Sequence, residues 1–189
     1  MSVCCTRAGS WHTGNMHARH VRDIDWTNWS AVDSATLVFV VRDGQVLLIR
    51  KKRGLGAGKI NGPGGRLEPS ETFAACAVRE VREELGVTPL DLHHFGDHRF
   101  QFVDGYSILV YVYRATDFSG TPIETDEAVP LWVAVTEIPF EEMWEDDRLW
   151  LPLLIEGRRF SGRWIFDGDR MLDYHLDVSG PWPETNADT

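Results

Sequence analysis

The chain has 189 residues, of which 43% are hydrophobic and 25% charged, and its formal net charge is −10. This is the composition of a globular domain, and the length suits a single domain with a sizeable core. The sequence lacks clustered Lys and Arg for a nucleic-acid surface, an apolar run of about 18 residues for a membrane span, and the cysteines of a disulfide framework. We therefore expect a cytoplasmic monomer with neither nucleic acid nor a membrane as partner.

The first 34 residues are polar and show no regular periodicity, so we expect an N-terminal extension that is partly flexible. Trp26 and Trp29 would be costly if exposed, and we expect them to tie part of this extension to the body of the protein. The cysteines and histidines of the extension have spacings that fit no zinc pattern: Cys4, Cys5, His12, His17 and His20.

The next stretch predicts the centre of a sheet. Ala35–Val41 is apolar and rich in β-branched residues, which is typical of a strand buried on both faces. Asp43-Gly44 is a hairpin signal, and Val46–Arg50 returns as the partner strand. A Gly-rich loop with a basic start, Lys51–Gly65, follows and is expected to face a ligand.

The second half of the chain predicts further strands and one more helix. The expected strands are Phe95–Phe102, Tyr106–Tyr113, Leu131–Val135, Phe160–Phe166 and Met171–Val178, and the second helix is completed by Leu151–Glu156. Strands interleaved with two helices predict an α/β sandwich with a mixed sheet over residues 35–178. Residues 179–189 are expected to form a tail.

The stretch from Gly64 to Val87 organises the chain, because it reads as a glycine loop followed by one helix with two unlike faces. Ser70 is the expected N-cap, Glu71 falls in the first turn, and Gly86 is placed to end the helix. The apolar stripe expected to face the core consists of Ala74, Ala77, Val78, Val81 and Leu85.

Three glutamates crowd together on another face of this helix. Glu80, Glu83 and Glu84 follow the i, i+3, i+4 rule, so their carboxylates repel one another unless a cation lies between them. Such an oxygen cluster suits a hard ion such as Mg²⁺, with Mn²⁺ as an alternative. A solvated acidic helix face is the other interpretation.

Nine residues of this stretch match a known motif without departure. Gly65, Glu71, Arg79, Glu80, Val81, Glu83, Glu84, Gly86 and Val87 fit the pattern G-x5-E-x7-R-E-U-x-E-E-x-G-U, with U aliphatic. The chain therefore resembles a Nudix hydrolase. The resemblance implies an αβα sandwich with a mixed sheet and a loop-helix-loop, and metal-dependent cleavage of a nucleotide substrate.

Four further stretches resemble the oxidised-purine nucleoside triphosphatase branch of that family, the MutT-homologue type found in animals. They are Lys51–Gly65, Gly120–Glu127, Ile138–Asp147 and Trp150–Leu154. This resemblance implies hydrolysis of substrates such as 8-oxo-dGTP and 2-oxo-dATP to monophosphate and pyrophosphate. The chain departs from the branch at Leu55, where an aromatic residue is expected, at Ile60, where tryptophan is expected, and at Glu145, which replaces a proline.

The resemblance also assigns roles to single residues. Metal and phosphate handling falls to Glu80, Glu83, Glu84, the Gly64 carbonyl and Glu127, with Lys51 near the phosphates and Arg79, paired with Glu71, orienting the carboxylates. Base recognition falls to Asn61, Asp146, Asp147, Trp144, Phe100, Thr36 and Leu55. The general base is one of Glu84, Glu80 and Glu127.

Asp146 and Asp147 have two interpretations. In one closed pocket they would disfavour double ionisation, so that one carboxyl keeps a proton and donates it to a base while the other accepts. Alternatively, the pair simply caps the helix that follows. Two other functions compete with nucleotide-pool sanitation: hydrolysis of a different nucleoside diphosphate derivative such as ADP-ribose, and a Nudix-fold binding module without activity.

Overall fold

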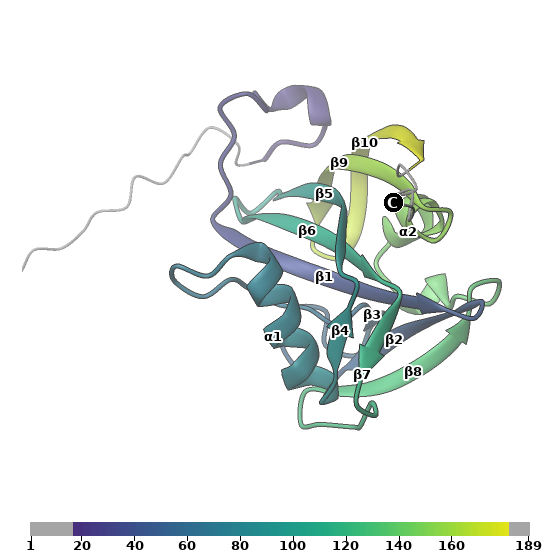
Figure 1. Cartoon of the computed structure of the whole chain (residues 1–189). Helices are drawn as coiled ribbons and strands as arrows, with labels where there is room; N and C mark the ends of the chain where they lie inside the picture. The colour runs from purple at the N-terminus through teal and green to yellow at the C-terminus, as the bar shows by residue number, and fades with distance from the viewer. Residues whose placement is uncertain (1–16, 182–189) are drawn as a thin grey trace, which may run out of the picture.

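A mixed eight-stranded sheet runs through the molecule, which the computed structural model describes over residues 17–181. The strands follow the order β10-β9-β5-β6-β1-β2-β3, and β8 also pairs with β2. The pairs β1–β6 and β5–β9 are parallel, whereas the other pairs of this sheet are antiparallel. The α/β fold with a mixed sheet is therefore confirmed (Figure 1).

The elements have the following bounds. The sheet contains β1 (Asp33–Arg42), β2 (Gln45–Lys51), β3 (Ile60–Asn61), β5 (His93–Phe102), β6 (Ser107–Ala115), β8 (Ala128–Ala134), β9 (Arg158–Asp167) and β10 (Arg170–Pro181). The helices are α1 (Phe73–Leu85) and α2 (Asp147–Ile155), with short 3-10 turns η2 (Val21–Asp23) and η3 (Phe140–Glu142). A separate two-stranded sheet joins β4 (Thr88–Leu90) to β7 (Asp117–Ser119).

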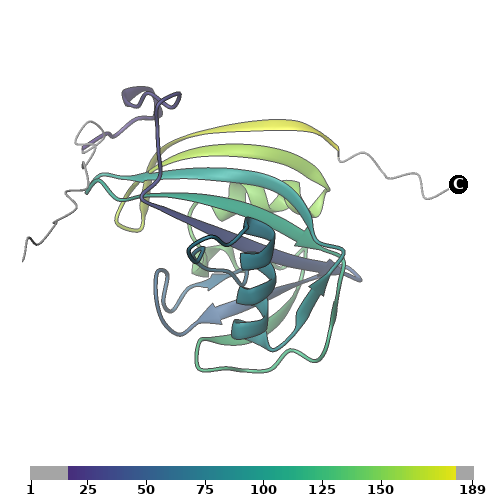
Figure 2. The ribbon, with the colours of Figure 1, turned by 60° about the vertical axis from the view of Figure 1, so that its left-hand side comes forward.

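Strand β1 shows why the molecule has three layers. Val38 and Val40 point toward α1 and pack in one core cluster with Val81. Phe39 points the other way and meets Trp150 of α2 edge-on, with ring centroids 5.5 Å apart. Because successive strand residues face opposite sides, β1 buries apolar groups on both faces, as predicted. Figure 2 shows α1 in front of the sheet and α2 behind it.

The start of α1 differs from the prediction. Ser70 has a φ of +68° and lies outside the helix, so its assignment as the N-cap is wrong. Thr72 is the cap, and its hydroxyl oxygen accepts a hydrogen bond from the Ala75 amide at 3.2 Å. A turn closed by the bond from Glu71 N to the Glu68 carbonyl delays the helix and leaves Glu71 before it. Gly86 ends the helix in the left-handed conformation, as predicted.

The burial of α1 also corrects the expected apolar stripe. Ala77, Val81 and Leu85 are buried as predicted, whereas Ala74 is exposed. Glu80 and Glu84 are buried although they are acidic, so a solvated acidic face is wrong for these two residues. The helix therefore presents both an apolar and an acidic stripe to the interior.

Several strands start earlier than their composition suggested. β8 begins at Ala128 rather than Leu131, because its register with β2 extends to Lys51. β3, β4 and β7 are each three residues or shorter and were not predicted. The second helix begins at Asp147. No helix among residues 17–181 is long and apolar enough to cross a membrane.

The described part of the N-terminal extension, residues 17–32, packs against the body. Ile24 is buried in a small cluster with Ile165 of β9, and Trp26 and Trp29 pack on this cluster. The Trp29 indole donates a hydrogen bond to Gln101 Oε1 at 3.0 Å. Cys4, Cys5 and His12 lie outside the described residues.

Candidate active site

The carboxylate of Glu84 forms the centre of the candidate site. Its side chain is buried, Oε2 accepts a hydrogen bond from Gly64 N at 2.7 Å, and Oε1 lies 3.2 Å from Lys51 Nζ. Lys51 Nζ also donates to the Gly64 carbonyl at 3.3 Å. The carbonyl and the carboxylate thus converge on one position that holds a positive charge. This donor set fits a divalent cation that prefers oxygen ligands.

Two glycines allow the loop to approach the helix and β1 this closely. Gly64 has a φ of +157°, and a Cβ there would lie 2.0 Å from the Thr36 carbonyl oxygen. A Cβ on Gly65 would lie 2.4 Å from the carboxylate of Glu80. Any larger residue at either position would have to displace the backbone of β1 or the buried glutamate.

Arg79 holds the glutamates around it. Its guanidinium donates to both carboxylate oxygens of Glu71 at 2.9 and 2.8 Å, to Glu80 at 2.8 Å and to Glu83 at 3.1 Å. The hydrogen bonds from Arg79 lower the pKa of Glu71 to about 2, so this carboxylate stays ionised at neutral pH. Arg79 lies where it orients the carboxylates, and its predicted pairing with Glu71 is present.

Burial prepares two of these glutamates to hold a proton. Removal from water raises the pKa of Glu84 to about 7, although the Lys51 charge and the Gly64 amide oppose this shift. Burial also raises the pKa of Glu80, against the effect of Arg79. A carboxylate with a pKa near neutrality is suited to general-base catalysis.

Glu127 and Glu83 are more exposed than Glu80 and Glu84. Glu127 lies just before β8, its side chain is 32% exposed, and it forms an ion pair with Arg53. Thr125 donates a hydrogen bond to the Glu84 carbonyl at 2.9 Å, which ties the Glu127 loop to α1. Within residues 17–181, no three His, Cys, Asp or Glu side chains form a group that could hold a metal ion. Arg53, Arg79 and Lys51 neutralise the carboxylates instead.

One cavity of about 210 Å³ lies beside this centre. Its lining includes every residue that the sequence assigned to substrate binding: Thr36, Lys51, Leu55, Asn61, Phe100, Trp144, Asp146 and Asp147. Gly64 lines the same cavity. Residues more than 100 positions apart in the chain therefore meet in one place, with polar groups at a few points of an apolar wall that is partly aromatic.

Asp146 and Asp147 are both 2% exposed. Asp146 Oδ2 accepts a hydrogen bond from the Trp150 indole at 2.9 Å, and Asp147 Oδ2 accepts one from Trp144 N at 3.0 Å. Asp146 Oδ1 is buried and has no partner. Asp146 stands at the N-cap position of α2 without a capping side-chain bond, so capping does not explain its carboxyl group.

Burial raises the pKa of Asp146 to about 6, and burial together with the Asp146 charge raises the pKa of Asp147. The pair therefore disfavours double ionisation, and it carries a proton near neutral pH.

Asn61 comes from β3, and its Oδ1 accepts a hydrogen bond from Gly62 N at 2.8 Å. The Trp144 indole has two close neighbours, Gly56 and Lys59. A Cβ added to Gly56 would lie 3.1 Å from the indole nitrogen, and Lys59 Nζ lies 4.9 Å from the ring centroid. These contacts fix the aromatic wall on one side of the cavity.

Sequence reasoning missed several cavity residues, namely Arg66, Phe102, Ile108, Val110, Trp150 and Phe166. A signal existed for two of them. Phe102 lies two residues after Phe100 in the same strand, so both side chains point to the same face of the sheet. Trp150 lies four residues after Asp146, on the same face of the helix. The others depend on strand pairing, which local patterns do not show.

Comparison with known proteins agrees with this geometry. The NUDIX domain family model matches residues 32–154. A zebrafish (Danio rerio) protein named oxidized purine nucleoside triphosphate hydrolase is 44% identical over 144 residues, which cover 75% of this chain and 92% of that protein. A mouse (Mus musculus) protein of the same name is 41% identical over 143 residues, with coverages of 75% and 92%.

Solved structures show the same fold. A crystal structure of a MutT protein from Bacillus halodurans superimposes with a TM-score of 0.70 at 25% identity, and the match covers 77% of this chain and 98% of that one. Nudix hydrolases generally use a divalent metal, and the oxygens around Glu84 fit that requirement. With its family match, its related sequences and its fold in agreement, the chain belongs to the Nudix family of hydrolases.

Proposed function

We propose that this protein hydrolyses oxidised purine nucleoside triphosphates, such as 8-oxo-dGTP and 2-oxo-dATP, to monophosphate and pyrophosphate, and so sanitises the nucleotide pool. The observation that carries this proposal is that one cavity is lined both by Asn61, Trp144, Asp146 and Asp147 and by Lys51 and Gly64. The amide, indole and two carboxyl groups suit a purine base, and the Lys51 ammonium group and the Gly64 backbone suit its phosphates. The names of the zebrafish and mouse relatives support the same substrate class.

The proposed base recognition uses the proton that the Asp146–Asp147 pair retains. A protonated carboxyl donates a hydrogen bond and an ionised one accepts, so the pair presents one group of each kind to a purine edge. Asp146 Oδ1, which is buried without a partner, is the atom that a base would satisfy. Asn61 adds an amide, while Trp144 and Phe100 supply apolar surface for stacking.

The proposed chemistry is attack of water on the β-phosphorus. The Gly64 carbonyl, Glu80, Glu83, Glu84 and Glu127 would hold Mg²⁺, or Mn²⁺ in its place, once the glutamates are released from Lys51, Arg79 and Arg53. The ion would supply charge neutralisation and a lowered pKa for water at this site. Glu84, which is buried beside this position, takes the proton from the attacking water. Arg79 keeps the carboxylates apart and oriented, and Lys51 moves from Glu84 to the phosphates.

We also propose that the protein acts as a cytoplasmic monomer with no nucleic-acid partner. The net charge of −10 supports the last point, because a nucleic-acid surface requires clustered Lys and Arg. The acidic site accepts a polyphosphate only when a cation accompanies it.

The test is pyrophosphate release from 8-oxo-dGTP, 2-oxo-dATP, dGTP and ADP-ribose, each with and without Mg²⁺. We expect the two oxidised purines to be preferred over dGTP and no release in the absence of metal. Equal rates for the first three substrates would contradict the sanitising role. Turnover of ADP-ribose alone would assign the site to a different substrate class.

A further inference from the structure

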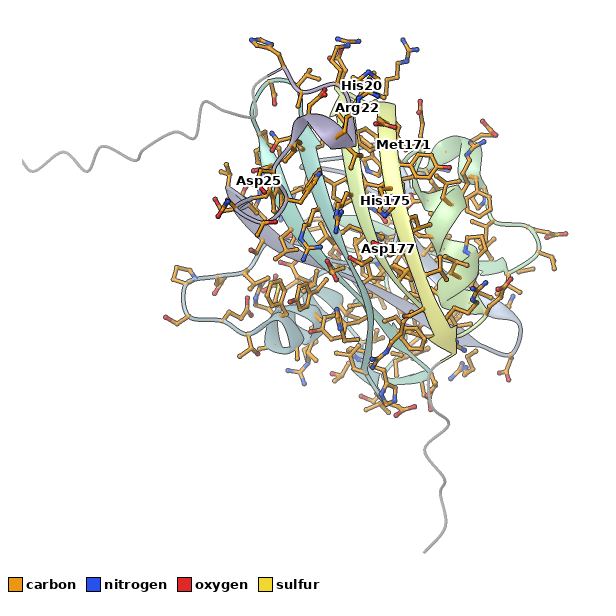
Figure 3. All side chains as sticks on the ribbon, turned by 90° about the horizontal axis from the view of Figure 1, so that it is seen from above. His20, Arg22, Asp25, Met171, His175 and Asp177 are labelled. Carbon is orange, nitrogen blue, oxygen red and sulfur yellow. The ribbon has the colours of Figure 1, made fainter. Side chains whose placement is uncertain are left out.

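The segment of residues 17–32, here called the strap, crosses the outside of the sheet directly behind the cavity. All of it except residue 32 precedes the residues matched by the family model, which begin at residue 32. In Figure 3 its labelled residues His20 and Arg22 lie close to Met171 at one end of β10, whereas Asp25 lies further from β10. Val21 N donates a hydrogen bond to Asp173 of β10 at 2.9 Å, which anchors this part of the strap.

The strap and the cavity use opposite faces of the same strands. In β5, Phe100 and Phe102 line the cavity, whereas Gln101 between them lies at the strap. In β9, Phe166 lines the cavity, whereas Ile165 is buried by strap residues. Because neighbouring strand residues point to opposite faces, a single layer of backbone separates the strap from the cavity wall.

Gln101 connects the two faces. It is 2% exposed, and its Oε1 accepts the hydrogen bond from the Trp29 indole at 3.0 Å. Its Nε2 donates to the carbonyls of Phe102 and Tyr106 at 3.1 Å each. Those two carbonyls belong to the two sides of the turn between β5 and β6, where Phe102 N also donates to the Tyr106 carbonyl at 2.9 Å. A buried amide with all these bonds fixes the end of the hairpin.

The strap holds the same hairpin at two further points. His17 N donates to the Val103 carbonyl at 3.0 Å, and Val32 N donates to the Ser107 carbonyl at 3.1 Å. Ser107 is followed by Ile108, which lines the cavity. Both sides of the β5–β6 turn are therefore tied to the strap by backbone bonds.

We propose that the strap sets the shape of the nucleotide cavity, and that Trp29 is a positioning residue which acts through Gln101 on the wall formed by Phe100 and Phe102. Without the Trp29 donor, Gln101 Oε1 is left unpaired in a buried position, and the amide turns to find another partner. Its bonds to the Phe102 and Tyr106 carbonyls then weaken, and the hairpin end loosens. The strap bonds described above reach the β5–β6 hairpin and not the carboxylates of α1, so we expect chemistry at the phosphates to be unchanged.

The variant Trp29→Phe tests this, because it removes the indole N–H and keeps an aromatic ring. Trp26→Phe is the matched control: Trp26 packs beside Trp29 with ring centroids 5.6 Å apart, but its indole donates to the Val21 carbonyl within the strap. Both variants lose one indole hydrogen bond, and only one of them loses the contact with Gln101.

The kinetic measurement rests on the proposed function. With 8-oxo-dGTP and Mg²⁺, Trp29→Phe should raise KM about fivefold, the ratio that corresponds to one hydrogen bond of about 1 kcal/mol, and leave kcat within about twofold. Trp26→Phe should leave both constants unchanged. Gln101→Leu should raise KM at least as much as Trp29→Phe, and the double variant should raise it no further.

A second measurement is independent of substrate. Amide hydrogen exchange at Phe102 and Gly105 should be about fivefold faster in Trp29→Phe and unchanged in Trp26→Phe, while exchange in α1 stays the same in both. Equal exchange at Phe102 in the two variants would overturn the role of the strap. Failure of the wild-type protein to turn over oxidised purines would instead refute the proposed function. The exchange measurement alone would then decide whether the strap positions the β5–β6 hairpin.

Discussion

Replacing Asp146 with asparagine should remove a large part of the pH dependence of stability. Asparagine has nearly the same shape, its carbonyl can still accept the Trp150 indole hydrogen bond, and it cannot ionise. The wild-type carboxyl is buried, and its pKa is raised from the ordinary 3.8 to about 6. The variant therefore isolates the free energy of ionising one buried carboxyl beside another.

The size and sign of the change in unfolding free energy with pH follow from the difference between the folded and unfolded pKa of Asp146. A raised pKa means that the folded protein binds this proton more tightly than the unfolded chain. The stabilisation is fully present below pH 3.8 and is lost as the pH rises through about 6. The interval from 3.8 to about 6, at 1.36 kcal/mol per pH unit, corresponds to about 3 kcal/mol. Asp147 adds to this change in the same direction, because in the variant it loses a neighbouring negative charge.

The assay is urea unfolding of both proteins in EDTA at pH values from 4 to 8. The unfolding free energy of Asp146→Asn minus that of the wild type should rise by about 2.5 kcal/mol over this range, because a small part of the ~3 kcal/mol is already lost at pH 4. Taking the difference cancels the contributions of other titrating groups. Asp43→Asn, whose parent side chain is 87% exposed, is the control. A difference that stays constant with pH would refute the burial argument.

Three further predictions concern the metal and phosphate end of the site. Glu84→Gln should lower kcat about a hundredfold, because the amide cannot accept the proton from water; near-normal turnover would remove Glu84 as the general base. Gly65→Ala should lower kcat/KM about tenfold or more, because its Cβ would lie 2.4 Å from the Glu80 carboxylate, and activity equal to wild type would show that Glu80 has room to move. EDTA should abolish pyrophosphate release and added Mg²⁺ should restore it, and release that persists in EDTA would contradict the metal-dependent reaction.

Local patterns predicted much of the fold because each depends on nearby residues. The apolar run before Asp43 predicted a strand buried on both faces, and β1 is such a strand. Gly86 was expected to end the first helix and does so with a φ of +72°. The helix start was wrong because the turn from Glu68 to Glu71 comes before Thr72, and both Ser70 and Thr72 are good caps in isolation.

The spacing of the glutamates showed which residues share a face but not what that face meets. Glu80 and Glu84 are buried because a loop of glycines folds over them, and the Glu84 pKa of about 7 results from that burial. The pairing of Lys51 with Glu84 likewise joins residues from β2 and α1, which only the tertiary structure brings together.

The sequence by itself determined the family and the helix that carries the carboxylates, and it predicted which residues would contact a purine base, because these are encoded in short motifs of fixed spacing. The tertiary structure decided that eight such residues line one cavity, that Asp146 Oδ1 is buried without a partner, and that Trp29 reaches Gln101 behind the cavity wall. These facts depend on burial and on contacts between distant segments. Strand pairing and packing of the whole chain create them, and no local pattern encodes them.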